Sequence, residues 1–238
     1  MKTLAYVDHL LRNREVVISD LKDDGKVSEV IKTCFKVFVT LTVLYGVIMG
    51  SQSLLHGYGQ GWMYSLASAV KLPLLFLLSL VICLPLLYVL NVLIGPREQF
   101  RVVLGILMSS LAVTSILLAA CALILAFFIL STKSYPFIVL LNVAIFTIAG
   151  LYGVWYLAKI MHGLAPAFEA KPGEWPAGNV KAVINWWLFT YAIVGTQMAW
   201  MMRPFIGSPG TPFSIFRAQE SNFYVNVFQL IGKMLGGG

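Results

Sequence analysis

Charged residues are scarce in this chain of 238 residues. Asp, Glu, Lys and Arg together make up 11% of it, whereas hydrophobic residues make up 59%. Soluble domains carry about 25% charged residues, so the chain has too little polar surface for a water-soluble globule of its size. The composition therefore argues against a soluble protein and predicts a protein embedded in a membrane.

Residues that bind metals or act as catalysts are also scarce. The chain holds three cysteines and three histidines, and the cysteines form no CxxC pair. In the topology predicted below, His9, His56 and His162 fall on a tail and at opposite ends of membrane spans, so they do not converge as ligands. No HExxH zinc motif and no GxSxG nucleophile elbow occurs. We therefore predict no catalytic residue, no metal site and no cofactor, and we expect that the protein is not an enzyme.

Basic residues give the chain a net charge of +7, but they form no cluster with interleaved aromatic residues. Such a cluster is typical of nucleic-acid binding, so we predict no nucleic-acid partner. Many of the Lys and Arg residues instead lie before the first predicted span or in loops on the same side of the bilayer. Because cytoplasmic loops are enriched in basic residues, we predict a cytoplasmic N-terminus and a C-terminus outside.

Long apolar runs fill most of the chain. After Lys71, residues 72–95 form a run of 24 positions without a charged side chain. A helix of about 20 apolar residues crosses a hydrocarbon core of about 30 Å, so this run predicts a transmembrane helix that starts just after Lys71. We predict an all-α polytopic membrane protein with five transmembrane helices, at about residues 37–55, 72–95, 102–130, 137–157 and 182–202.

Residues 1–33 form the only markedly charged segment, ahead of the transmembrane domain at 34–202. Apolar residues keep helical spacing on both sides of Asp23-Asp24-Gly25, from Leu4 to Leu11 and from Val27 to Ile31. We interpret the segment as two short amphipathic helices at the cytoplasmic membrane surface, and a partly ordered tail is the alternative. The segment lacks the apolar run of a signal peptide, so we expect the first span to direct insertion.

Residues 203–238 form a tail that we expect outside the cytoplasm. Prolines near its start prevent a continued helix. Farther on, apolar residues between Phe223 and Leu235 share one helical face, and polar residues between Asn222 and Lys233 share the opposite one. This pattern predicts an amphipathic helix in the membrane interface, and docking on a partner is the alternative.

Small residues recur at helical spacing in two spans. Gly46 and Gly50 lie four positions apart in the first span, which favours close packing within the chain or, alternatively, a dimer interface. The third span carries small residues at steps of three and four, which predicts one continuous packing face. These residues are Gly105, Ser109, Ala112, Ser115, Ala119, Ala122 and Ala126.

Polar groups inside the predicted spans are few, and Asp, Glu, Lys and Arg are missing near mid-depth. Amides there form hydrogen bonds between helices or, alternatively, line a polar path. The amides are Asn91, Asn142, Asn185 and Gln197. Pro85 lies in the middle of the second span, where it predicts a helix kink and a broken helix of the kind that transporters use at binding sites.

Two stretches, LLRNREVVISDLKDDGKV at 10–27 and KLPLLFLLSLVICLPLLYVLNVLIG at 71–95, fit a plan of a polar N-terminal segment followed by five closely spaced helices. This plan resembles the Yip1-like membrane proteins, and the resemblance implies a five-span fold. The DLYGP-type motif of the eukaryotic members is missing, so we transfer no functional residue. The block RPFIGSPGTPFSIFRAQESNFY at 203–224 looks like that of uncharacterised bacterial polytopic proteins, which implies a bacterial inner membrane.

The small-residue faces, the amphipathic ends and the missing catalytic groups together predict a non-enzymatic membrane scaffold or assembly subunit. We expect it to act in the lipid bilayer as a homo-oligomer or with other membrane subunits. The alternative is a channel or transporter subunit that uses the helix broken at Pro85 and the intramembrane amides.

Overall fold

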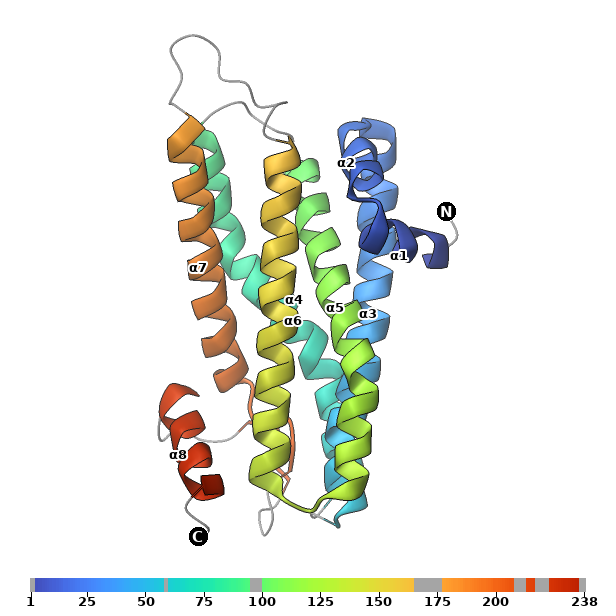
Figure 1. Cartoon of the computed structure of the whole chain (residues 1–238), viewed down its shortest axis with the longest axis vertical. Helices are drawn as coiled ribbons and strands as arrows, with labels where there is room; N and C mark the ends of the chain where they lie inside the picture. The colour runs from blue at the N-terminus through green and yellow to red at the C-terminus, as the bar shows by residue number, and fades with distance from the viewer. Residues whose placement is uncertain are drawn as a thin grey trace. The chain divides into compact units, whose positions relative to one another are not determined.

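The computed structural model describes residues 3–57, 60–94, 100–164, 177–207, 213–216 and 223–235. All regular elements in these ranges are α-helices, which confirms the predicted all-α fold (Figure 1). They are α1 (Thr3–Arg12), α2 (Arg14–Lys22), α3 (Asp24–Leu55), α4 (Gly61–Ile94), α5 (Phe100–Ser131), α6 (Tyr135–Leu164), α7 (Ala177–Met201) and α8 (Phe223–Leu235).

Four of these helices are long and apolar enough to cross a membrane. Helices α3, α4, α5 and α6 contain 32, 34, 32 and 30 residues. A rise of 1.5 Å per residue makes each of them about 45–50 Å long, more than the hydrocarbon core of about 30 Å. The candidate spans within the described residues are Gly25–Leu55, Gly61–Pro85, Arg101–Ser131 and Tyr135–Met161.

The second span starts earlier than predicted. Helix α4 begins at Gly61 and passes through Lys71 without a break, so the prediction that the span starts after Lys71 is wrong. The expected break at Pro85 is also wrong, because α4 is one helix through Pro73 and Pro85. A proline removes a single backbone hydrogen bond, which does not divide this helix in two. The kink predicted at Pro85 stays a prediction.

The N-terminal segment differs from its prediction in how its helices are divided. The break at Asp23 lies where it was expected, but Val27 and Ile31 belong to the first turns of α3 and not to a separate surface helix. An additional break falls at Asn13, whose backbone leaves the helical region with φ −122° and ψ 71°. The predicted boundary at residue 33 therefore falls inside a continuous helix.

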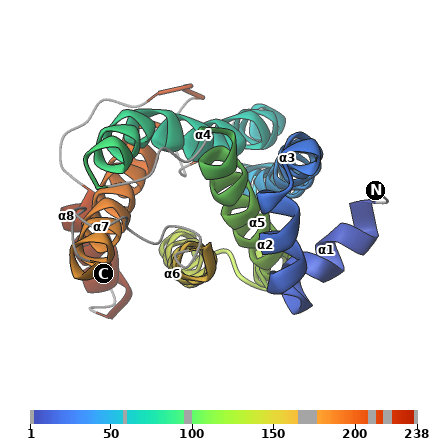
Figure 2. The same ribbon diagram turned by 90° about the horizontal axis from the view of Figure 1, so that it is seen from above.

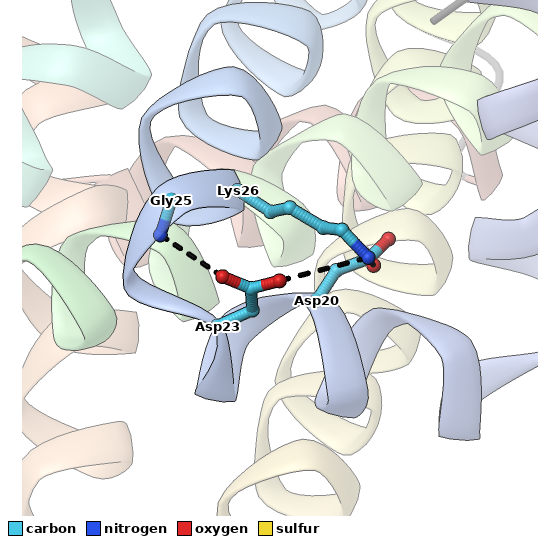
Figure 3. A network of polar contacts seen from close by, with 4 residues as sticks. All are labelled: Asp20, Asp23, Gly25 and Lys26. Atoms are coloured by element: carbon cyan, nitrogen blue, oxygen red, sulfur yellow. Dashed lines mark hydrogen bonds and ion pairs between the residues drawn. The ribbon is translucent and has the colours of Figure 1, made fainter.

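A small polar network fixes the turn between α2 and α3 (Figure 3). The Asp23 carboxylate accepts a hydrogen bond from the backbone N–H of Gly25 at 3.0 Å. The Lys26 ammonium lies 3.4 Å from the Asp20 carboxylate and 3.7 Å from that of Asp23. Because an aspartate at a helix start satisfies a free N–H group, this network explains why α3 begins here.

Two compact units divide the chain, and their boundaries fall within the long helices. Unit 1 comprises Met1–Val39, Leu80–Ile116 and Gly150–Ala192. Unit 2 comprises Thr40–Ser79, Leu117–Ala149 and Ile193–Gly238.

In unit 1, α1 and α2 pack against the long helices. Tyr6, Leu10, Val17 and Leu21 are each at most 1% exposed. A Cβ atom added at Gly105 of α5 would lie 2.6 Å from the Leu21 side chain, so α2 closely approaches α5 (Figure 2). The first predicted surface helix corresponds to α1, and Leu10 of its apolar face is buried within the chain, whereas Leu11 is 44% exposed.

In unit 2, α3 and α4 form a close antiparallel pair. A Cβ atom at Gly46 would lie 2.6 Å from the backbone oxygen of Ser68, and one at Gly50 would lie 2.5 Å from the Cα of Ser65. No real side chain fits at such distances, so these glycines let the two backbones meet. An apolar cluster fills the rest of unit 2, built from Tyr45, Met49, Leu72, Leu118, Ala122, Leu125, Ile129, Ile138, Ile145, Ala149 and Ile206.

Candidate functional site

A lysine is buried inside one of the candidate spans. Lys71 of α4 is 5% exposed, and its ammonium donates hydrogen bonds to the carbonyls of Met202 and Pro204 at 3.0 Å each and to the carbonyl of Ile215. Three acceptors match the three N–H donors of an ammonium group. Lys71 therefore binds the chain that follows α7, and its donors are occupied.

The position of the Met202 carbonyl strengthens this contact. It directly follows the last residue of α7, Met201, where helical carbonyls lack partners and carry partial negative charge. The ring of Phe216 lies 5.1 Å from the Lys71 ammonium and that of Phe205 lies 5.8 Å from it. Carbonyl dipoles and aromatic faces thus stabilise the buried cation.

The segment after α7 docks on the α3–α4 pair through further contacts. The Ser68 hydroxyl donates to the carbonyl of Phe205, and the N–H of Gly207 donates to the Ser53 hydroxyl at 2.8 Å. Within the same unit, the rings of Tyr64 and Phe213 meet edge to face at 4.9 Å. The first described residues of the predicted tail are therefore part of the folded unit 2 and not a detached segment.

The amide of Asn142 joins two helices in unit 2. It is 5% exposed, its carbonyl oxygen accepts a hydrogen bond from the Tyr45 hydroxyl at 3.0 Å, and its NH₂ donates to the carbonyl of Ile138 at 2.9 Å. The Tyr45 ring also meets Phe146 edge to face at 5.6 Å. Of the two predicted roles for Asn142, this geometry matches the hydrogen bond between helices.

The structure places the other predicted path residues separately. Asn185 is exposed on α7 in unit 1, whereas Gln197 is half-buried on α7 in unit 2. Asn91 belongs to α4, and its side chain lies outside the described residues. Pro85 is exposed.

The small-residue face of α5 is largely covered by the chain itself. Gly105, Ser109, Ala112, Ser115 and Ala122 are buried, and Ala119 and Ala126 are half-buried. In unit 1 the Ser109 hydroxyl lies 3.6 Å from the Cys34 thiol of α3. This face therefore packs largely within the chain.

Helix α5 makes a second contact in unit 1, with α6 at Gly153. The Ser110 hydroxyl donates to the carbonyl of Gly153 at 2.8 Å, and a Cβ atom at Gly153 would collide with the Thr114 hydroxyl. The sequence carries the signal for this contact in Gly153 and in the hydroxyl-bearing residues at 110 and 114, one helical turn apart. The other α6 glycine, Gly150, has no neighbouring atom within 4 Å of an added Cβ.

Gln52 of α3 is a buried polar residue that the sequence pattern did not single out. Its side chain is fully buried, and neither its amide oxygen nor its amide nitrogen has a hydrogen-bond partner among the described residues. Leaving a buried polar group unpaired costs about 1–3 kcal/mol. One turn farther on, the His56 ring nitrogen Nε2 lies 3.1 Å from the carbonyl of Ile129 in the same unit. Gln52 is therefore a polar side chain whose burial its hydrogen bonds to the described residues do not explain.

These features define the class: a helical integral membrane protein whose buried polar groups tie its helices and its C-terminal segment together. Among the described residues, no group of three or more His, Cys, Asp or Glu is placed to hold a metal ion. No protein-family model matches the chain, and comparisons with curated proteins and with solved structures give no match.

Proposed function

We propose that this protein is a non-enzymatic scaffold or assembly subunit of a larger membrane complex. The proposal rests on the observation that the side chains of Lys71 and Asn142 form hydrogen bonds with other parts of the same chain. Charged and amide groups inside spans are costly and in transporters usually serve ions, protons or substrate. Here both groups bind the chain's own helices and the segment after α7. Their hydrogen bonds therefore stabilise the fold and are not left open for a transported ion or solute.

A fifth span by α7 and a cytoplasmic N-terminus belong to this proposal. Helix α7 has 25 residues and is therefore about 37 Å long, enough for one crossing. Trp186, Phe189 and Ile193 on it are 69%, 57% and 39% exposed. Such side chains are stable in lipid or against another apolar helix, and the distribution of basic residues supports the orientation.

The exposed aromatic residues of α7 also supply the surface for a partner. Trp186 and Phe189 meet edge to face at 6.0 Å. Aromatic residues are enriched at the cores of protein interfaces. Because the small-residue face of α5 is occupied within the chain, we place the contact with another membrane subunit, or with a second copy of this chain, on α7.

Native mass spectrometry of the protein, gently extracted from its own membrane, tests the proposal. We expect a particle larger than the 26.3 kDa chain, and its dissociation when Trp186 and Phe189 are both replaced by leucine. Leu123→Ala is the matched control, because Leu123 of α5 is also highly exposed, at 78%, but lies outside the proposed surface. A chain that is always found alone would overturn the scaffold proposal.

A channel or transporter subunit is the second candidate, and Gln52 favours it. Its fully buried amide has no hydrogen-bond partner in the described part of the chain, and a passing ion or polar solute would satisfy such a group. Ion or solute flux in liposomes that falls with Gln52→Leu would support this candidate. Flux that is absent, or unchanged by both Gln52→Leu and Asn142→Leu, would exclude these residues from a path.

A further inference from the structure

Two cations converge on one exposed tryptophan in unit 1. The guanidinium carbon of Arg14, at the start of α2, lies 5.8 Å from the centre of the Trp155 ring of α6, and the ammonium of Lys159 lies 5.7 Å from it. Trp155 is 46% exposed. Cations are attracted to the face of an indole ring at such distances, so both charges are held around the same exposed ring.

Neither cation is neutralised by the part of the chain that the structure describes. The ion pairs there join Arg12 to Asp8, and Lys26 to Asp20 and Asp23. Arg14 and Lys159 take part in none of them, and both side chains are exposed. The pair therefore presents an unmatched positive charge, which is suited to an anionic ligand.

The position of Trp155 and Lys159 along α6 indicates which kind of anion the two cations would bind. The helix has 30 residues and is thus about 45 Å long, close to the 40–45 Å of a bilayer with its headgroups. Trp155 and Lys159 lie near its end at Leu164, at the level where tryptophan and lysine anchor spans at the membrane interface. One turn deeper on the same face, Leu151 is 65% exposed and Tyr152 is 37% exposed. The Tyr152 ring lies 5.3 Å from that of Trp155, tilted by 39°.

We propose that Arg14, Trp155 and Lys159 bind the headgroup of an anionic phospholipid, with Leu151 and Tyr152 against its acyl chains. Guanidinium and ammonium groups form charge-assisted hydrogen bonds with phosphate oxygens, and basic pockets beside membrane helices bind anionic headgroups. An acidic peptide would need a polar surface beyond the cations, whereas this surface continues into exposed leucine. The proposal does not depend on the scaffold role.

Lipid binding to the full-length protein tests this site. The purified chain is equilibrated in nanodiscs of phosphatidylcholine alone or with phosphatidylglycerol, and retained lipid is weighed by native mass spectrometry. We expect retained phosphatidylglycerol, and about thirtyfold less of it for the R14Q/K159Q double variant, because each of the two basic residues adds about 1 kcal/mol near an anionic surface. Equal retention of both lipids by the unchanged protein would overturn the proposal.

Matched variants separate a defined site from general attraction by positive charge. The K22Q/K32Q double variant also removes two exposed cations of unit 1 and should keep its bound phosphatidylglycerol. The R14K/K159R variant keeps both charges and should retain most of the lipid. This variant also tests the site if R14Q/K159Q folds poorly, and loss of the lipid in a well-folded R14K/K159R variant would contradict the proposal. An equal loss in K22Q/K32Q and R14Q/K159Q would show that no specific site exists.

Discussion

The ammonium of Lys71 donates a hydrogen bond to the carbonyl of Met202 at 3.0 Å, although 131 positions separate the two residues. The contact closes α4 of unit 2 onto the carbonyl end of α7. With the carbonyls of Pro204 and Ile215, the ammonium has acceptors for all three donors. A lysine that a span would otherwise exclude thus becomes the attachment point of the C-terminal segment.

Replacing Lys71 by methionine should release that segment. Hydrogen bonds to a charged group contribute about 1.5–3 kcal/mol each, and the three carbonyls lose their donor together. Methionine also removes the cost of burying a charge, which offsets part of this loss, so we expect a net loss of about 2–4 kcal/mol of stability. Thermal unfolding in detergent measures the loss, and limited proteolysis should show earlier cleavage within residues 203–216. Lys36→Met is the control, because Lys36 is exposed. Equal protection of the tail in both variants would contradict this role.

The Tyr45–Asn142 hydrogen bond should behave as a coupled pair. Tyr45→Phe and Asn142→Leu each remove one partner of a 3.0 Å bond, and each should destabilise the protein. Hydrogen bonds between membrane helices couple by about 0.6 kcal/mol on average and by up to about 1.7 kcal/mol. The double variant should therefore lose less stability than the two single variants summed. Strictly additive losses in steric-trapping or thermal measurements would show that the bond contributes nothing.

The sequence predicted the features that depend on local pattern. Apolar runs predicted the four long helices, and the spacing of Gly46 and Gly50 predicted a close helix contact, because both signals lie within a few turns of one helix. The burial of Lys71 could not be predicted in this way. Its acceptors are backbone carbonyls far along the chain. Every residue has such a carbonyl, so the sequence does not show which ones accept a hydrogen bond from Lys71. The sequence therefore indicated only that Lys71 marks the end of a span.

The N-terminal helices illustrate the same limit. Their amphipathic spacing is visible in the sequence, but a membrane surface and an apolar face of the same protein both satisfy it. The small residue Gly105 indicated that some helix approaches α5, while its partner Leu21 emerges only from the tertiary contacts. Similarly, Gly150 and Gly153 look equivalent in the sequence, yet only Gly153 lies against a neighbouring helix.

Adding a methyl group at Gly46 should be far more harmful than adding one at Gly150. The new Cβ at Gly46 would lie 2.6 Å from the Ser68 carbonyl oxygen, which is backbone and cannot rotate away. Overpacking of this kind costs about 1–3 kcal/mol or more. Among the described residues, the new Cβ of Gly150→Ala meets no atom of a neighbouring element within 4 Å, and the variant should gain up to about 1 kcal/mol from helix propensity. Similar melting temperatures for the two variants would contradict the close α3–α4 contact.

Alkaline pH should loosen the docking of α1. Burial raises the pKa of the Tyr6 hydroxyl above its ordinary value of 10.0, and the nearby Cys34 thiol and Asp20 carboxylate raise it further. The unfolded chain therefore loses this proton at lower pH than the folded one, so the contribution of Tyr6 to stability is complete below about pH 10 and declines as pH rises above that value.

The Tyr6→Phe variant separates this titration from general alkaline unfolding. It removes the ionisable group, and it also removes a buried hydroxyl that has no hydrogen-bond partner among the described residues. We expect α1 of this variant to stay protected from hydrogen exchange above pH 10, at values where the unchanged protein opens. Tyr224→Phe is the control, since Tyr224 of α8 is 46% exposed. If Tyr6→Phe opens at the same pH as the unchanged protein, the ionisation of Tyr6 does not govern the docking of α1.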